Sequence, residues 1–201
     1  MGRGVTQGWK LNAGPIAPIA SFATLAMGCW IAFSCYVSSR GPARVLAVLG
    51  LGAASEVLGL ATGLPFGRYQ YTGRWWPSLT ISGLGPFPLL LPFAWLLIAG
   101  SAYLLASTFF RDRIPAVVLG ALIATATDLV MEPAMTGTLG YWRWLERGAL
   151  PGGAPLLNPM GWFVTSLLAG LLLGKSDGTW KGPAIALAGQ LALILGFQIP
   201  L

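Results

Sequence analysis

Six long apolar stretches decide what this chain can fold into. A helix rises about 1.5 Å per residue, so about 20 apolar residues cross a hydrocarbon core about 30 Å thick. Backbone polar groups inside lipid must be satisfied within the segment, which favours helices. We therefore predict an all-α fold, a polytopic membrane helical bundle of about six transmembrane helices, with residues 1–201 as a single integral membrane domain. The stretches lie near residues 16–38, 44–63, 84–108, 114–135, 159–174 and 183–199.

The charge content supports a membrane location. Only 9% of the residues are charged and 55% are hydrophobic, whereas a soluble domain carries roughly 25% charged residues. The net charge of +6 comes from basic residues scattered in ones and twos. This pattern is typical of the ends of membrane spans and differs from the clustered basic patch of nucleic-acid-binding proteins. We expect membrane lipid as a partner and no nucleic acid.

Metal-ligating residues of the usual kinds are almost missing. The chain has no histidine and only two cysteines, Cys29 and Cys35, so zinc sites of the usual composition are excluded and we expect no bound metal. Six residues apart on a helix, the two cysteines are rotated by about 240° and cannot pair. We interpret them as reduced core thiols.

Proline, asparagine and glycine indicate helix ends and helix contacts. Asn158 precedes Pro159 and is predicted to cap a helix. Three prolines stand at expected helix starts, where a missing N–H costs nothing: Pro115, Pro159 and Pro183. Two Gly-x-x-x-Gly pairs lie inside spans and predict close helix packing: Gly59 with Gly63, and Gly170 with Gly174.

An even number of spans places both termini on one side of the membrane, which we name side A. The first stretch is longer than the apolar region of a signal peptide, so we expect it to be retained. Side A also carries the two long connections, near 64–83 and 136–158. Lysine and arginine are equally frequent on the two sides, so the positive-inside rule gives no orientation.

The six acidic residues form two groups. Three lie in loops beside basic residues and are expected to be solvated: Asp112, Glu146 and Asp177. The other three lie inside apolar spans: Glu56, Asp128 and Glu132. An ionisable group near the bilayer centre costs at least about 2.5–3.5 kcal/mol and usually faces the protein interior.

The three acidic residues within spans have similar depths. Counted from side A, Glu56 and Asp128 lie roughly 10 Å below the boundary and Glu132 roughly 5 Å. Asp128 and Glu132 are four residues apart and share a helix face. We therefore predict that the three carboxyl groups meet in one cavity that opens toward side A, lined also by Asn158 and by Tyr69 or Tyr71.

An ordered set of motifs extends from about residue 50 to residue 165. It comprises Glu56-x-x-Gly59-x-x-x-Gly63-x-Pro65-Phe66-Gly67-x-Tyr69-x-Tyr71, then Asp128-x-x-Met131-Glu132-Pro133, Gly140-x-Trp142-x-Trp144 and Asn158-x-x-Gly161-Trp162. The set resembles the membrane carotenoid hydratases, the CruF-like enzymes that include the bisanhydrobacterioruberin hydratases. An aromatic belt explains part of the ring content on side A, but not its clustering with Arg68 and Arg143.

The resemblance implies addition of water to the terminal double bond of an acyclic carotenoid end, lycopene-like or C50, to give a tertiary alcohol. It implies no cofactor, a location in the cell membrane of a prokaryote, and association with other carotenoid-pathway enzymes. We expect Asp128, Glu132 and Glu56 to be catalytic. The expected substrate-binding residues are Phe66, Arg68, Tyr69, Tyr71, Trp142, Trp144, Asn158 and Trp162.

Hydration needs a protonated acid, a stabilised carbocation and a water molecule. From its depth we expect Asp128 to protonate the less substituted alkene carbon, since removal from water favours a neutral carboxyl group. Glu132 would orient the water and Glu56 would stabilise the tertiary cation, with help from aromatic ring faces.

Three other interpretations remain open. The carboxyl groups could simply join helices through hydrogen bonds. A prenyltransferase would use carboxylates to hold magnesium diphosphate, although the paired aspartate-rich motifs of such enzymes are missing from the sequence. A proton-coupled transporter also buries carboxyl groups, but it would be expected to show repeated halves.

Overall fold

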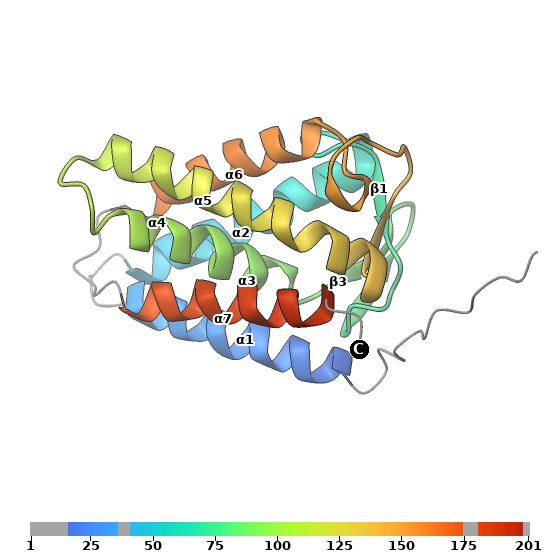
Figure 1. The fold of residues 1–201 in the computed structure, drawn as a ribbon, viewed down its shortest axis with the longest axis horizontal. Helices are drawn as coiled ribbons and strands as arrows, with labels where there is room; N and C mark the ends of the chain where they lie inside the picture. Colours follow the sequence, from blue (N-terminus) through green and yellow to red (C-terminus); the bar gives the residue numbers. More distant parts are fainter. Residues whose placement is uncertain (1–15, 36–40, 175–180, 199–201) are drawn as a thin grey trace, which may run out of the picture.

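The computed structural model describes residues 16–35, 41–174 and 181–198. In this part of the chain six helical segments run side by side as an elongated bundle, with α1 beside α7 along one face (Figure 1). Four segments are single helices at their full length: α1 (Ile16–Cys35), α2 (Gly41–Thr62), α6 (Leu157–Leu173) and α7 (Lys181–Gln198). The other helical elements are α3 (Leu91–Trp95), η1 (Leu96–Gly100), α4 (Ser101–Ala106), α5 (Arg113–Pro133), η2 (Ala134–Thr138) and the short 3-10 turn η3 (Pro151–Gly153).

The six segments occupy the six apolar stretches, so the predominantly helical fold is confirmed. Crossing a membrane is a separate matter. Within the described residues, two helices are long and apolar enough to do so by length and composition: α2, and the continuous segment Arg113–Thr138 that joins α5 to η2. The apolar helices Leu91–Ala106 and Leu157–Leu173 are shorter. Six membrane spans are therefore not confirmed.

The prediction of an all-α fold is wrong for the two long connections and for the start of the third apolar stretch, which contain short antiparallel strands. Strand β1 (Tyr69–Tyr71) pairs with β4 (Trp142–Trp144), placing Tyr69 opposite Trp144 and Tyr71 opposite Trp142. Strand β2 (Ser78–Ile81) pairs with β3 (Gly85–Pro88). Backbone groups in these connections need partners, and aromatic residues pack well in strands. The strands lie at one end of the bundle (Figure 1).

Pro133 explains the change from α5 to η2. Proline has no N–H, so the α-helical hydrogen-bond ladder cannot continue through it, and a five-residue π-helical turn follows. The Thr136 hydroxyl donates to the backbone carbonyl of Glu132 at 2.8 Å. Glu132 therefore lies where the helix changes its winding, a feature that recurs at functional sites.

Only part of the glycine prediction is confirmed. Gly170 lies against Tyr103 and so allows two helices to approach closely. Gly63 and Gly174 have φ angles of +83° and +71° and end α2 and α6 instead. Gly59 faces the connection that follows α2, against Phe66 and Tyr69, and not another helix.

The three prolines lie in the first turns of α5, α6 and α7, as predicted. The predicted helix cap at Asn158 is wrong, because α6 begins one residue earlier and its N-terminus has no side-chain cap.

Cys29 is exposed and not a core thiol, whereas the side chain of Cys35 lies outside the described residues. Asp112 and Glu146 are exposed as expected; Asp177 lies outside the described residues.

Candidate active site

A cavity of about 80 Å³ lies within the bundle, between the helices and the strand-bearing connections. One water molecule needs about 10–15 Å³ on this measure, so the space holds several waters or the end of a hydrocarbon chain. Its walls are mainly aromatic and aliphatic. Its polar lining includes Glu56, Glu132, Asn158, Tyr69, Tyr71 and Tyr141.

Glu56 accepts three hydrogen bonds on the wall formed by α2. Its Oε2 accepts from the hydroxyl of Tyr69 at 2.5 Å and from that of Tyr71 at 2.9 Å. Its Oε1 accepts from the indole N–H of Trp95 at 2.9 Å. Burial, with the nearby Glu56 charge, raises the pKa of both phenols well above the ordinary value. Both hydroxyls therefore keep their protons and serve as donors to this carboxyl group.

Gly59 makes room for this arrangement one helical turn after Glu56. A Cβ at position 59 would lie 2.7 Å from the Tyr69 hydroxyl oxygen and 3.1 Å from the Phe66 ring. The absence of a side chain therefore lets Tyr69 reach across the helix to Glu56. Sequence reasoning found this glycine but assigned it to helix packing.

We expect Gly59→Ala to destabilise the protein by about 1–3 kcal/mol, the usual range for overpacking a buried contact. Gly50→Ala is the matched control on the same helix, because nothing lies within 4 Å of its added Cβ. Helix propensity should make that control neutral or stabilising by up to about 1 kcal/mol. Thermal unfolding in one detergent measures both, and equal stability of the two variants would contradict the packing role of Gly59.

Asp128 and Glu132 form a second acidic group on α5, joined by Asn158 of α6. The Asn158 amide nitrogen lies 2.6 Å from Asp128 Oδ2 and 3.5 Å from Glu132 Oε1. The Trp144 indole donates to Glu132 Oε2 at 3.0 Å. The side chain of Asn158 is therefore used between helices and not at its own helix end.

The acidic residues differ in their access to the cavity. Glu56 and Glu132 line it, whereas Asp128 does not, and Asp128 has no exposed surface. Among the described residues, Asp128 Oδ1 has no hydrogen-bond partner. Asp128 therefore lies behind Glu132 and Asn158, connected to the cavity through them.

Aromatic rings surround these polar groups. Trp95 and Trp162 stack with ring centroids 4.0 Å apart, and Trp75 stacks on Tyr141 at 5.2 Å. Tyr71 meets Trp142 edge to face at 6.2 Å. Ring faces attract positive charge through their quadrupoles. The walls thus combine an apolar surface with groups that can stabilise a carbocation.

The structure brings most of the sequence-predicted residues to one cavity. Those that line it are Glu56, Phe66, Tyr69, Tyr71, Glu132, Trp142, Trp144, Asn158 and Trp162. Arg68 is not brought to it: its side chain is exposed, and its backbone carbonyl accepts from the amide of Leu145 at 2.9 Å. Arg68 precedes β1, which begins at Tyr69, and Tyr69 is buried where Arg68 is exposed.

Sequence reasoning missed Trp95 and Tyr141 as lining residues. Tyr141 lies inside the Gly140-x-Trp142 motif, so its position in that motif was an available signal. Trp95 stands in an apolar stretch where no pattern distinguishes it from an ordinary core residue. Only its contact with Glu56 shows what it does.

Comparison with known proteins adds the family. The family described as carotenoid biosynthesis protein matches residues 16–195. No match was found among curated proteins or solved structures. The matched range contains the cavity, both acidic groups and both pairs of strands. The chain therefore belongs to the carotenoid biosynthesis protein family.

Proposed function

We propose that this protein is a membrane carotenoid hydratase, which adds water to the terminal double bond of an acyclic carotenoid without a cofactor. The family supports a role in carotenoid biosynthesis. One observation carries the choice of reaction: Glu56 and Glu132 line the same aromatic cavity. Alkene hydration needs an acid and a separate group that stabilises the cation, and two carboxyl groups in different surroundings can divide these roles.

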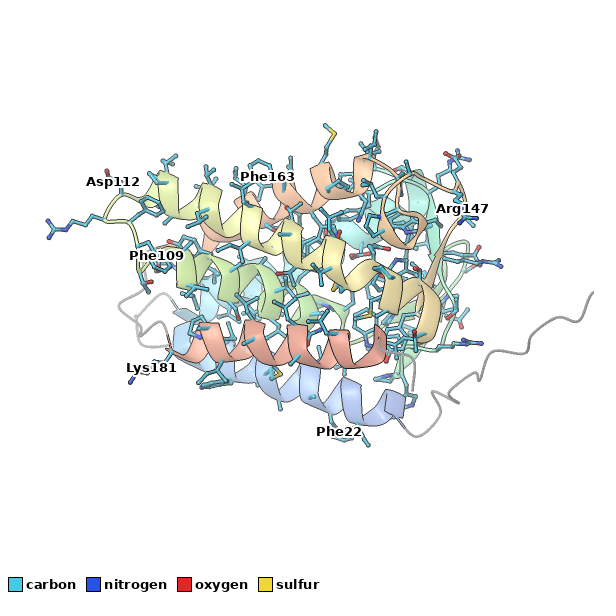
Figure 2. All side chains as sticks on the ribbon, in the orientation of Figure 1. Phe22, Phe109, Asp112, Arg147, Phe163 and Lys181 are labelled. Carbon is cyan, nitrogen blue, oxygen red and sulfur yellow. The ribbon has the colours of Figure 1, made fainter. Side chains whose placement is uncertain are left out.

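A location within the membrane fits the distribution of side chains. Arg147 lies at the strand-bearing end of the bundle and Asp112 at the opposite end, while Phe22 and Phe163 project from its long sides (Figure 2). Large apolar side chains are exposed along the helices, among them Leu46 and Leu122. We propose that all six segments lie in the cell membrane of a prokaryote, from which an apolar carotenoid can enter.

The accessibility of the acidic groups favours Glu132 as the proton donor in place of Asp128. Glu132 faces the cavity, whereas Asp128 lies behind it and is joined to it through Asn158. The alkene π electrons take the Glu132 proton to form a new C–H bond at the less substituted carbon. The resulting tertiary cation is stabilised by Glu56 and by ring faces. Water then forms the C–O bond, and its proton returns to the Glu132 carboxylate.

Expression in a host that makes lycopene tests the reaction class. Membranes that contain the protein should yield pigments heavier by one or two waters, as measured by mass spectrometry of the extracted carotenoids. Folded protein with unchanged pigment would contradict hydration of lycopene. The same assay with an acyclic C50 carotenoid then decides whether the proposed reaction is wrong for both substrates.

Magnesium-dependent turnover of a prenyl diphosphate would favour the prenyltransferase alternative, and proton flux into vesicles would favour the transporter.

A further inference from the structure

The side chain of Tyr141 lines the cavity, and its buried hydroxyl has no hydrogen-bond partner among the described residues. Its side chain is 3% exposed. Buried hydroxyls nearly always have a partner, so an isolated one at a cavity wall indicates a bound polar group.

The other described tyrosines differ from Tyr141 in this respect. Tyr69 and Tyr71 both donate to Glu56, and the Tyr103 hydroxyl donates to the backbone carbonyl of Gly174 at 2.7 Å. Tyr141 is therefore the phenol in the described part of the chain whose hydroxyl is available to a ligand.

Tyr141 is also held firmly in place. Its backbone N–H donates to the carbonyl of Met135 at 2.7 Å, and its carbonyl accepts from the amide of Thr72 at 3.0 Å. Its ring stacks on Trp75 with an angle of 15° between the ring planes. These contacts come from η2 and from the connection that carries β1. Because the backbone and ring of Tyr141 are held from both sides, its hydroxyl is preorganised for one position of a ligand.

We propose that the Tyr141 hydroxyl binds the water that is added to the carotenoid and directs its oxygen toward the carbocation. This inference rests on the proposed hydration. The phenol donates to or accepts from the water and forms no covalent bond. Burial raises the pKa of Tyr141 above its ordinary value, so the hydroxyl is neutral and retains its proton. Without this contact, water would still reach the cavity but would be poorly oriented.

The fate of the cation distinguishes water positioning from a general effect on structure. A tertiary cation that is not captured by water loses a proton to a carboxylate and returns to an alkene. In D2O the acid delivers a deuteron, so the recovered carotenoid carries deuterium at the protonated carbon. Loss of a proton from a methyl group instead gives an isomer with a terminal methylene. Slower capture therefore raises the amount of deuterated or isomerised alkene relative to alcohol.

Tyr141→Phe in D2O is the test, with purified protein and the acyclic carotenoid that the wild-type protein hydrates. Phenylalanine keeps the ring on Trp75 and removes the hydroxyl alone. We expect kcat for alcohol formation to fall by about 10-fold, the effect of losing one hydrogen bond to the reacting water. We also expect an unchanged KM, an unchanged unfolding temperature and a higher ratio of deuterated alkene to alcohol. Tyr103→Phe is the control, and its ratio should equal that of the wild-type protein.

The outcomes separate the two proposals. An alcohol yield and deuterium ratio equal to the wild-type values would overturn the water-binding role of Tyr141 while leaving hydration intact. A raised KM with an unchanged ratio would show that the hydroxyl binds the carotenoid and not the water, which also overturns it. A wild-type protein that forms no alcohol from lycopene or an acyclic C50 carotenoid would overturn the proposed function, and the role of Tyr141 with it.

Discussion

Glu132→Gln is expected to lower carotenoid hydration by about 10²-fold or more, the loss typical of removing a general acid. Glutamine keeps the size of the side chain, and its amide oxygen can still accept from Trp144. It has no acidic proton to give to the alkene. Because the cavity walls are preserved, carotenoid binding should change little, and the loss should appear in the single-turnover rate at saturating carotenoid.

Glu146→Gln is the matched control for this change. Glu146 is exposed in the connection between β4 and α6, so its neutralisation should leave hydration unchanged. Asp128→Asn supplies the discriminating comparison, because Asp128 lies behind Glu132. We expect its loss of activity to be smaller than that of Glu132→Gln. If Asp128→Asn is the slower variant in a folded protein, the proton comes from Asp128 and our assignment of the donor is wrong.

Glu56→Gln is expected to lower hydration by roughly 10²–10³-fold, comparable to the loss of a preorganised electrostatic contact at a transition state. Two effects act together. The substitution removes negative charge that faces the cation. It also places an amide N–H2, itself a donor, against the three groups that donate to Glu56 in the wild-type protein. Deuterium exchange into the carotenoid should fall along with alcohol formation, because the cation itself forms more slowly.

Tyr71→Phe tests whether the charge or the hydrogen bonds matter more. It removes the 2.9 Å donor to Glu56 and keeps the carboxyl group and the ring contact with Trp142. We expect a loss of about 10-fold, smaller than for Glu56→Gln.

For Glu56→Gln itself, wild-type rates would show that the aromatic rings alone stabilise the cation, and Glu56 would then be a structural residue.

The sequence determined which residues are available to the site. Glu56, Asp128 and Glu132 stand out because a carboxyl group inside an apolar stretch is costly unless it faces the interior. Helical periodicity placed Asp128 and Glu132 on one face, and residue counting gave Glu56 a similar depth. Hydrophobic stretches of sufficient length likewise predicted the six helical segments. Local composition and hydrophobic period can be recognised in the sequence without knowing which other segments each helix packs against.

How these residues meet depends on the packing of the helices against one another. Rotation of a helix about its axis is set by packing against its neighbours, so residue counting could not show that Glu132 faces the cavity while Asp128 lies behind it. From the sequence, the Asn158 side chain could form hydrogen bonds either with the backbone at its own helix end or with side chains of a neighbouring helix. Because α5 and α6 approach closely, it contacts the carboxyl groups of Asp128 and Glu132.

The pairing of β1 with β4 is another contact that the sequence alone could not predict, because the two strands lie far apart in the chain. It joins Tyr71 to Trp142, which lie in two connections far apart in the sequence, and helps to form the aromatic wall of the cavity. Each of these strands is three residues long, too short to leave a period in the sequence. Their hydrogen bonds depend on the bundle bringing two distant connections together, and that juxtaposition is a property of the packed chain and not of either segment.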